Sequence, residues 1–580
     1  MRSTRLRHLL SLLGPYRRRV LLMLVSLVLA TGAALVPPYL AGKAIDDGIR
    51  AGDTGVLTVI LVVFAAAAAI NWGATYVQTF LINWVGQRAL QDLRIELFHH
   101  LQGLSVGFYG RNRTGVLISR LTNDVQALDQ LVTEGISTLF SATLTLIGTG
   151  VILLVLDAEL ALITFLTFPV LFAGSIAFRL ASSGAYRLTR EKIAAVTAYL
   201  QETLSGVRVV RAFGQEPRHR RRFAELNDEH RRVNMKTVYL NAAYFPSVEL
   251  LSAVATGGIL LYGGNQVLDG EGAVTIGVLA SFVFYLQSFF DPIQSLSQLY
   301  TTYQAGMAAL DKIFELLDEE PDLRDKPDAV SMPRIRGDID FEDVTFAYSG
   351  DNPALCEVDL RIPPGQTVAL VGATGAGKST LAKLVARFYD PDHGRVLIDG
   401  FDLRDVTERS LRSQLGIVPQ ESFLFSGTIG ENIAFGRPDA TGEDVRRAAA
   451  AVGAHEFIER LPDGYDTEVG ERGGHLSAGQ RQLVAFARAA AADPRILILD
   501  EATSNVDVRT EAQIERGLRR LLAGRTALVI AHRLSTIRGA GRIVVLDRAR
   551  IVEQGTHEEL LEADGAYAAL YRDWARQAVA

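Results

Sequence analysis

The residues with the clearest potential for chemistry form a glycine-rich loop with the pattern G-x-x-x-x-G-K-[ST]. An apolar, β-branched run at residues 367–371 precedes this loop, and a helical pattern follows it. Glycines at this spacing let backbone amides close around phosphate oxygens at a helix N-terminus. Lys378 would neutralise the β- and γ-phosphates of a nucleotide, and Ser379 would ligate Mg²⁺. The residues predicted to bind the phosphates are Gly372, Ala373, Thr374, Gly375, Ala376, Gly377, Lys378, Ser379 and Thr380.

An acidic pair, Asp500 and Glu501, ends the apolar run at residues 496–499. A carboxylate at the end of such a strand can hold Mg²⁺ beside a phosphate loop, which assigns Asp500 to the metal. The adjacent Glu501 can then polarise an attacking water as general base. An acidic pair after a strand is often only the end of that strand. The phosphate loop earlier in the chain favours the catalytic interpretation here.

Short apolar runs that could position these residues recur throughout residues 336–580. They read TVALVG, RVLIDG, LGIVPQ, RILILDE, ALVIAH and RIVVLD, and helical patterns separate them. This alternation predicts an α/β domain with a largely parallel sheet. Residues 318–335, which are rich in proline and charge, are predicted to be a linker that leads into it.

Composition limits the kind of protein that carries these motifs. The chain has 580 residues, of which 48% are hydrophobic and 21% charged, and its mean hydropathy is +0.17. This length predicts more than one domain. The single Cys356 excludes a disulfide framework and a zinc site built on paired cysteines. The net charge of −6 gives no reason to expect nucleic acid as a partner.

Residues 1–317 contain six apolar stretches that are long enough, or nearly so, to cross a bilayer. Buried core helices are the alternative, but six stretches almost free of charge favour a six-span transmembrane domain. Glu249 and Asp291 lie in the fifth stretch and at the end of the sixth. Acids at this depth are candidates for function, although each could also reach water or a neighbouring helix. The stretches are residues 20–41, 56–85, 136–156, 160–178, 245–262 and 274–290.

The charges between these stretches predict the topology. The two long connections are basic, the short ones are mainly acidic, and the first 19 residues hold six arginines and no acid. Basic residues stay on the cytoplasmic side, so both termini and both long connections are predicted to be cytoplasmic. The basic N-terminus is interpreted as an interfacial helix. Arginines of the long connections include Arg88, Arg94, Arg111, Arg113, Arg120, Arg179, Arg187, Arg190, Arg208 and Arg211.

The long connections themselves show helical apolar spacing, at residues 89–104 and 188–204. The spans are therefore predicted to continue below the membrane as helical stalks. Each pair of stalks is expected to reverse direction at a polar point that contains glycine or proline, at residues 110–115 and 214–217.

Taken together, these motifs resemble a bacterial ATP-binding-cassette exporter half-transporter of the type IV exporter fold. The resemblance covers essentially the whole chain. Leu476-Ser477-Ala478-Gly479-Gln480 resembles the family signature, usually LSGGQ, and residues 504–507 occupy the position of the D-loop. The resemblance implies one transmembrane domain, residues 1–317, and one nucleotide-binding domain, residues 336–580. It also implies ATP and Mg²⁺ as cofactors.

The resemblance also implies roles for single residues. Tyr348 matches the aromatic residue that stacks on adenine, and Gln420 matches a glutamine that reaches Mg²⁺ and the attacking water. His532 matches the switch histidine that holds the γ-phosphate. Coupling helices are expected near residues 111–120 and 213–220. The resemblance further implies a dimer in which two nucleotide-binding domains pair head to tail. In that dimer Ser477, Gly479, Gln480 and Asp507 would contribute to nucleotide sites.

The function implied is ATP-driven export of an amphipathic or hydrophobic substrate, such as a drug, lipid or peptide. It would use alternating access in a multi-pass protein of a bacterial cytoplasmic membrane. One alternative is an exporter-fold importer of a metal chelate, and another is a regulatory or channel-like membrane ATPase. Glu501 and His532 argue against the last, because a gate needs only binding. Aromatic residues on the spans could line a cavity, pack helices or meet lipid; they are Trp72, Tyr76, Phe80, Tyr244, Phe245, Phe284, Tyr285 and Phe289.

Two departures from the family pattern concern the partner, a second half-transporter. The signature has Ala478 where glycine is usual, and the D-loop reads Ser-Asn-Val-Asp where Ser-Ala-Leu-Asp is usual. An added methyl group at a backbone that contacts phosphate hinders close approach. Both changes resemble the subunit of heterodimeric exporters that keeps the catalytic glutamate. The sequence therefore favours a heterodimer over a homodimer.

Overall fold

The computed structural model describes residues 14–269, 274–348, 350, 352–500, 508–531 and 533–579. The chain forms two compact units with separate cores. The helical unit comprises Met1–Gln102 and Thr114–Glu319, and the α/β unit comprises Gly103–Arg113 and Glu320–Ala580. A short segment from the first long connection, residues 103–113, is therefore part of the α/β unit.

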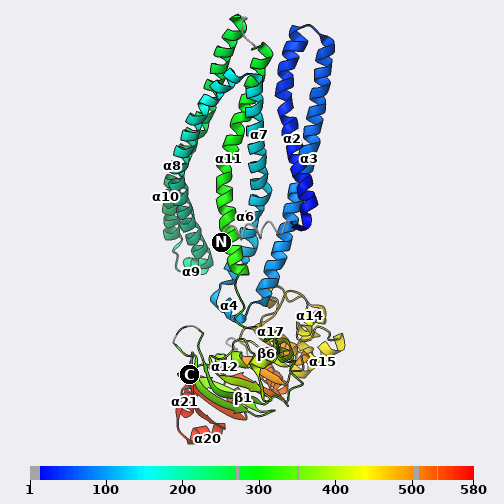
Figure 1. Cartoon of the computed structure of the whole chain (residues 1–580). Helices are drawn as coiled ribbons and strands as arrows, with labels where there is room; N and C mark the ends of the chain where they lie inside the picture. The colour runs from blue at the N-terminus through cyan, green and yellow to red at the C-terminus, as the bar shows by residue number, and fades with distance from the viewer. Residues whose placement is uncertain are drawn as a thin grey trace. The chain divides into compact units, whose positions relative to one another are not determined.

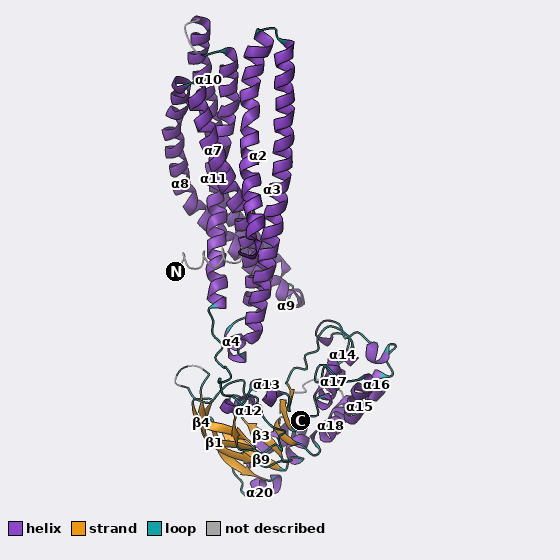
Figure 2. Cartoon of the chain, turned by 45° about the vertical axis from the view of Figure 1, so that its right-hand side comes forward, coloured by secondary structure: helices purple, strands orange, loops and turns teal. Residues whose placement is uncertain are grey.

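Six helical segments of the described chain are long and apolar enough to cross a membrane, as predicted. They are Gly14–Arg50, Thr54–Gly103, Thr114–Leu156, Ala158–Ser205, Glu216–Leu268 and Ile276–Ile293. Their main helices, visible in Figures 1 and 2, are α2 (Arg17–Lys43), α3 (Thr54–Gly103), α7 (Ile136–Leu156), α8 (Ala158–Ser205), α10 (Glu216–Asp269) and α11 (Ile276–Leu317).

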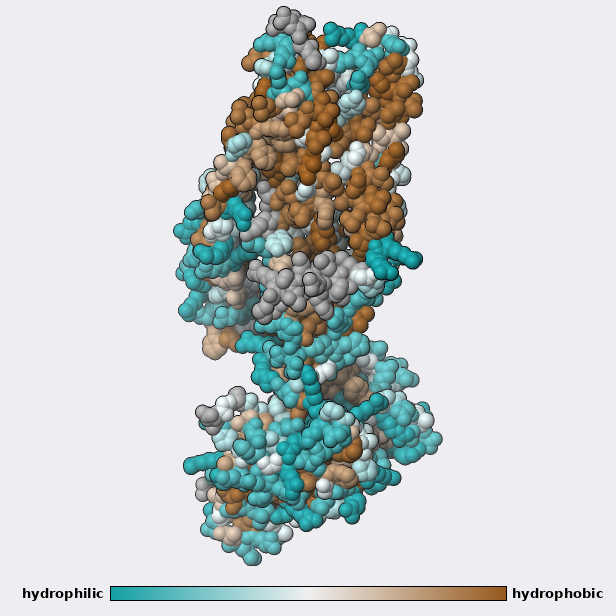
Figure 3. All heavy atoms as spheres, in the orientation of Figure 1, coloured by the Kyte–Doolittle hydropathy of each residue, from teal (hydrophilic) through white to brown (hydrophobic). Residues whose placement is uncertain are grey.

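Three of these helices are much longer than a bilayer requires. The helix α3 has 50 residues, α8 has 48 and α10 has 54. At a rise of 1.5 Å per residue these helices extend roughly 70–80 Å, more than twice the hydrocarbon thickness. Figure 3 shows a broad hydrophobic band on the upper part of the helical unit, with hydrophilic residues at its tip and in its lower part. The predicted continuation of the spans as helical stalks is confirmed.

Short elements separate the long helices. The first connection contains α4 (Val106–Arg111), α5 (Thr114–Ser119) and α6 (Val125–Asp129), and the second contains α9 (Val207–Ala212). Asn112 and Arg113 interrupt the helix between α4 and α5, and Gly214 turns the chain at a φ of 60°. The helix α4 ends at Arg111, the first residue of the expected range 111–120, and α5 lies inside that range, whereas α9 ends one residue before the expected range 213–220. Further turns are η1 (Gly14–Tyr16), η2 (Ala44–Arg50), η3 (Arg120–Asp124) and η4 (Gln130–Gly135).

The core of the helical unit lies where α7, α8, α10 and α11 meet. Leu153, Leu160, Ile259 and Phe282 are fully buried there. Three of the aromatic residues considered as cavity lining, Tyr244, Tyr285 and Phe289, are buried. These three therefore pack helices, whereas Trp72, Tyr76, Phe80 and Phe284 are exposed.

The α/β unit contains a six-stranded sheet with the order β10-β9-β3-β8-β7-β6. Its strands β9, β3, β8, β7 and β6 are parallel to their neighbours, and only β10 is antiparallel. The predicted α/β domain with a largely parallel sheet is thus confirmed. The strands are β3 (Thr367–Gly372), β6 (Leu415–Val418), β7 (Ile496–Asp500), β8 (Thr526–Ile530), β9 (Arg542–Asp547) and β10 (Arg550–Gly555).

A second, four-stranded antiparallel sheet has the order β2-β1-β4-β5, which the sequence did not predict. The run RVLIDG, assigned above to the parallel sheet, forms β4 and pairs with β1. That assignment was wrong because a short apolar run indicates a buried strand but not its partner. The strands are β1 (Ile339–Phe346), β2 (Leu355–Ile362), β4 (His393–Ile398) and β5 (Phe401–Asp402).

Helices of the α/β unit cover these sheets and form a second helical layer around α17. They are α12 (Lys378–Val385), α13 (Glu408–Arg412), α14 (Ile429–Ala434), α15 (Gly442–Val452), α16 (His455–Ile458), α17 (Ala478–Ala491), α18 (Val508–Leu522), α19 (Leu534–Arg538), α20 (His557–Glu562) and α21 (Ala566–Val579).

Hydrogen bonds and an ion pair join the predicted linker to the rest of the α/β unit. The backbone of Val330 exchanges hydrogen bonds of 3.0 Å with Asp405 O and Thr407 N. The guanidinium of Arg387, which is only 1% exposed, lies 3.2 Å from a carboxylate oxygen of Asp325. A buried arginine needs such partners because its charge has lost its water. These bonds attach the segment to the surface that carries the phosphate loop.

Candidate functional site

The phosphate loop lies between β3 and α12, the strand and helix that the motif requires. Gly372, Gly375 and Gly377 have φ values of 147°, 84° and 106°. A side chain at Gly372 would lie 2.2 Å from Leu546 O, and one at Gly377 would lie 2.6 Å from Ala354 O. Only glycine fits these two positions, because both the backbone conformation and the space exclude a Cβ atom. The tight turn leaves backbone amides free to face an anion at the start of α12.

Lys378 occupies the inside of this loop. Its side chain is 6% exposed, and its Nζ donates hydrogen bonds of 2.7 Å to Gly372 O and 2.9 Å to Ala373 O. Burial lowers the pKa of Lys378, and the nearby carboxylate of Asp500 opposes this shift. A desolvated ammonium group gains from a bound anion. The loop therefore holds a cation where phosphate oxygens would enter.

Asp500 stands at the carboxyl edge of the parallel sheet, beside the loop. In register, Asp500 pairs with Ile530 of β8, and Ile530 also pairs with Leu370 of β3. The ends of neighbouring parallel strands form the usual ligand edge of such sheets. Ser379 is the second residue of α12, and it is exposed. A hydroxyl and a carboxylate at this edge are oxygen ligands of the kind that Mg²⁺ prefers, so the donor set fits the ion.

Tyr348 lies close to the same helix. Its hydroxyl is 3.2 Å from Thr380 Oγ1, and the Nζ of Lys383 donates to it at 3.3 Å. The ring is 42% exposed and meets the ring of Phe346 edge to face at 5.0 Å. Edge contacts hold the ring in place and leave aromatic surface for stacking. The structure thus brings Tyr348, the loop and Asp500 together within one unit.

The signature residues lie at the start of α17. Ser477 Oγ accepts a bond of 3.2 Å from Gln480 N, and Gln480 Oε1 accepts one of 2.9 Å from Ser477 N. This capping box fixes the first turn of a 14-residue helix. Gly479 is buried, whereas Ser477 and Ala478 are exposed. No hydrogen bond between these residues and the phosphate loop occurs in the described part of the chain.

Gln420 follows β6 and is exposed. Beyond it lies a group of exposed phenylalanines, which we call the aromatic patch: Phe423, Phe425 and Phe435, with exposed fractions of 47%, 46% and 57%. The rings of Phe425 and Phe435 stack with centroids 4.6 Å apart. The aromatic patch is not among the predicted site residues, although Phe423 and Phe425, close behind Gln420 in the sequence, were a signal for it.

Arg488 of α17 forms hydrogen bonds with the backbone and side chain of residues in and next to the aromatic patch. Its guanidinium donates to Phe423 O at 2.9 Å, to Asn432 O at 2.9 Å and to Asn432 Oδ1 at 2.8 Å. The same group lies 5.4 Å from the ring centre of Phe435. Burial lowers the pKa of Arg488. Since Arg488 lies on the helix that Ser477 caps, one rigid helix joins the signature to the patch.

Three predicted site residues, Glu501, His532 and Asp507, lie outside the described residues. The strands that lead to two of them are described, because β7 ends at Asp500 and β8 ends at Ile530. Their catalytic roles therefore stay predictions. Glu249 on α10 and Asp291 on α11 are exposed.

Comparison with known proteins agrees with this arrangement. Residues 20–293 match the family model for the ABC transporter transmembrane region, and residues 355–504 match the model for the ABC transporter. The chain is 42% identical over 566 residues to the uncharacterized ABC transporter ATP-binding protein YknV of Bacillus subtilis, covering 97% of this chain and 93% of that protein.

Two further similarities carry more specific names. The chain is 39% identical over 566 residues to the ATP-dependent lipid A-core flippase of Syntrophus aciditrophicus, covering 98% of this chain and 94% of that protein. Its structure is similar to that of a bacterial Atm1-family ABC exporter with ATP bound, with a TM-score of 0.79 and 34% identity. This match covers 97% of the chain and 98% of the solved one.

Proposed function

Because the chain belongs to the ABC transporter family, as a half-transporter that joins a membrane domain to an ATP-binding domain, we propose that it exports an amphipathic or hydrophobic substrate. The chain is a multi-pass bacterial membrane protein and an ATPase coupled to transport. The names of its relatives include lipid flippases and multidrug exporters, which supports export over import of a metal chelate.

The observation that carries this proposal is the buried ammonium group of Lys378 inside the loop, with Asp500 at the adjacent strand end. Lys378 would neutralise β- and γ-phosphate oxygens, Ser379 and Asp500 would hold Mg²⁺, and Tyr348 would stack on adenine. When bound, the metal ion would supply charge stabilisation for the transferred phosphoryl group. Glu501 accepts a proton from the attacking water, and Gln420 and His532 orient the water and the γ-phosphate.

The site is completed by a second half-transporter, whose signature faces this loop. In return, Ser477 and Gly479 of this chain present the positive end of α17 to the partner's nucleotide. The exposed methyl of Ala478 lies in that first turn. We assign the partner to a different chain, so that the dimer is a heterodimer. Glu501 then serves a site that hydrolyses ATP, and Ala478 faces a second site that binds ATP but hydrolyses it poorly.

Coupling runs through α4, which packs within the α/β unit although it follows directly on α3. Arg111 Nη2 lies 2.8 Å from Asp322 Oδ2, and Ser105 Oγ donates to the same oxygen at 2.9 Å. Gly107 lies against Tyr389 and Asp322 closely enough that an added Cβ would be 3.1 Å and 3.0 Å from them. Motion of the α/β unit is thereby passed to a transmembrane helix. The basic charge of the long connections supports a cytoplasmic position for this unit and both termini.

The test is substrate-stimulated ATPase activity of the chain, purified from its source membranes with any bound partner. Amphipathic compounds of several classes are added, and Lys378→Ala serves as the control. We expect stimulation by at least one class and none in the variant. Activity that no amphiphile changes would support the channel-like ATPase instead.

A further inference from the structure

Arg387 takes an unusual position at the end of α12, the helix that begins at the phosphate loop. Its N–H donates to Leu384 O at 3.0 Å, and the N–H of Phe388 donates to Lys383 O at 2.9 Å. This is the pattern of a helix end that is closed by a left-handed residue, and glycine is the usual residue there. Arg387 has a φ of 47°. An arginine kept in a conformation that favours glycine indicates a task for its side chain.

The side chain of Arg387 lies inside the α/β unit, where it joins separate segments of the chain. It is only 1% exposed, and its Nη1 donates to Val406 O at 2.7 Å. Its Nε lies 3.2 Å from Asp390 Oδ1, and its Nη1 lies 3.2 Å from Asp325 Oδ1. Asp390 belongs to the segment that follows α12, whereas Asp325 belongs to the linker. The guanidinium therefore attaches the linker to the end of the helix that carries the phosphate loop.

The linker has a second paired carboxylate shortly before Asp325. Asp322 Oδ2 lies 2.8 Å from Arg111 Nη2 of α4 and accepts a bond of 2.9 Å from Ser105 Oγ. One aspartate thus binds α4, and the other binds the residue that closes α12. We call these two ion pairs, Arg111–Asp322 and Asp325–Arg387, the linker clasp. The chain enters the clasp from α11, which ends just before the linker.

Stability alone is a poor reason for the pair between Asp325 and Arg387. The lost hydration of a guanidinium and a carboxylate offsets much of their attraction, so a buried ion pair often adds little to the free energy of unfolding. Asp325 is 37% exposed, and Asp390 already compensates the charge of Arg387. The carboxylate of Asp325 therefore adds a connection between two segments rather than a needed counter-charge.

The two ends of α12 serve different segments. Lys378 begins this helix of eight residues inside the phosphate loop, and Arg387 follows its last turn. So short a helix moves as one body, and a displacement of the loop on nucleotide binding also displaces the other end. Tightly packed elements pass small shifts of this kind to their neighbours. Arg387 and the linker are the neighbours at that end.

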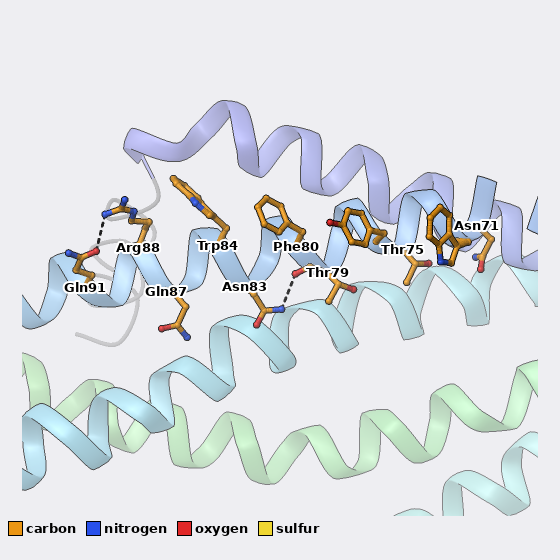
Figure 4. A pocket seen from close by; sticks show the side chains of 11 residues that line it. Asn71, Thr75, Thr79, Phe80, Asn83, Trp84, Gln87, Arg88 and Gln91 are labelled. Carbon is orange, nitrogen blue, oxygen red and sulfur yellow. Dashed lines mark hydrogen bonds between the residues drawn. The ribbon is translucent and has the colours of Figure 1, made fainter. Parts of the chain in front are cut away.

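The clasp also connects to α3, which directly precedes α4 in the chain. Side chains along one face of α3 line a groove of about 880 Å³ (Figure 4). Two amides of this helix bond to neighbouring helices: Asn71 Nδ2 donates to Ala30 O of α2 at 2.8 Å, and Gln87 Nε2 donates to Asp129 Oδ2 of α6 at 3.1 Å. A shift of α3 is therefore shared with α2 and α6.

We propose that the linker clasp is the connection by which nucleotide binding at the phosphate loop reaches α3 and α11. Nucleotide binds beside Lys378, α12 shifts, and the clasp carries the shift through Asp325 and Asp322 to α4. Arg387 is a positioning residue rather than a catalytic one, because it acts through the linker. This inference rests on the proposed function, since it names the contacts that couple ATP to the membrane helices.

Hydrogen exchange followed by mass spectrometry tests the clasp on the full chain, purified from its source membranes with any bound partner. The nonhydrolysable analogue AMP-PNP is added with Mg²⁺, and exchange is measured at residues 88–103 of α3. We expect AMP-PNP to change the exchange rate there by about fivefold or more, as for typical coupling between two sites. Asp325→Asn should remove most of this change, because it removes the charge that holds Arg387 and keeps the shape of the side chain.

Control variants separate a connection from a merely structural contact. Asp325→Glu keeps the carboxylate and should retain most of the response to AMP-PNP. Asp328→Asn is the matched control, because the Asp328 carboxylate forms no hydrogen bond or ion pair within the described residues. It should respond like the parent protein. Exchange without nucleotide and the affinity for AMP-PNP should be the same in all these variants.

Arg111→Gln tests whether both ion pairs lie on one route. On a single route, the double variant with Asp325→Asn responds as much as the weaker of the two single variants. Two independent contacts would instead combine their losses. That result would overturn the assignment of both pairs to one clasp.

An undiminished response in Asp325→Asn would overturn the inference and leave the proposed function intact. So would a loss that is accompanied by weaker AMP-PNP binding or by altered exchange without nucleotide, because the pair would then be structural. A parent protein that binds AMP-PNP without any change at α3 would refute the coupling on which the proposed function depends.

Discussion

The ring of Tyr389 meets the ring of Tyr348 edge to face, with centroids 5.2 Å apart and planes at 89°. Tyr389 also lies against Gly107 of α4. The residue proposed to stack on adenine is therefore one side chain away from the helix proposed to couple ATP binding to transport. Aromatic pairs of this geometry add only about 1 kcal/mol, but they fix the position of both rings.

Gly107→Ala should weaken this coupling. The new Cβ would lie 3.1 Å from Tyr389 Cε1 and 3.0 Å from Asp322 Oδ2, so these two side chains or α4 must move by a few tenths of an ångström. We expect nearly unchanged ATP affinity and a several-fold loss of substrate-stimulated ATPase activity. Gly110→Ala is the matched control, because its nearest contact would be the Tyr389 hydroxyl at an ordinary 3.9 Å. Equal stimulation in both variants would argue against a coupling role for α4.

Nucleotide affinity should fall at alkaline pH. In the free protein, burial holds the pKa of Lys378 below its ordinary value of 10.5, and a bound phosphate would raise it again. At a pH below this lowered pKa, the ammonium of Lys378 is charged in the nucleotide-free and in the nucleotide-bound protein, so the affinity for ATP does not change with pH. At a pH above it, Lys378 must take up a proton when ATP binds, and the affinity for ATP falls by up to about tenfold per pH unit.

Titration calorimetry with ATP at increasing pH measures this dependence. Lys378→Arg, whose guanidinium stays protonated, should give a flat profile over the same interval. A wild-type affinity that stays constant up to pH 10.5 would exclude a lowered pKa for Lys378.

Glu501→Gln should bind ATP normally and fail to turn it over, since an amide cannot accept the proton of the attacking water. The variant is expected to trap nucleotide in the closed dimer. Filter binding of labelled ATP and release of phosphate separate the two steps. Steady-state turnover near that of the wild type would place the general base elsewhere.

Arg488→Met should destabilise the α/β unit. It leaves Phe423 O and Asn432 O without their donor, which costs about 3 kcal/mol. Thermal unfolding followed by fluorescence should show a clear decrease in melting temperature. Arg447→Ala is the control, because the Arg447 side chain is 70% exposed and pairs only with neighbours on its own helix. Surface ion pairs of this kind contribute little, so equal melting temperatures would contradict the role given to Arg488.

Expressed alone, the chain should have low, weakly cooperative ATPase activity, because Ala478 would then face both nucleotide sites. Ala478→Gly should raise this activity. Vigorous, cooperative turnover by the unaltered chain alone would instead favour a homodimer and leave Ala478 without consequence.

The parts of the fold that the sequence predicts well have local causes. The loop from Gly372 to Ser379 and the apolar spans depend on residue types at fixed spacing, and the structure contains the strand, helix and long helices that these patterns require. Pairing across the chain has no such signal. The antiparallel partner of β4 and the ion pair between Arg111 and Asp322 join segments far apart in sequence. The aromatic patch likewise depends on Arg488, which lies on another helix.

The most direct test of ATP-driven export uses inverted membrane vesicles from the source bacterium, because they retain any natural partner. Uptake of a fluorescent amphiphile is followed after ATP is added. We predict ATP-dependent uptake with the wild-type chain and none with Lys378→Ala or Glu501→Gln expressed at the same level. Equal uptake in all three preparations would contradict the account.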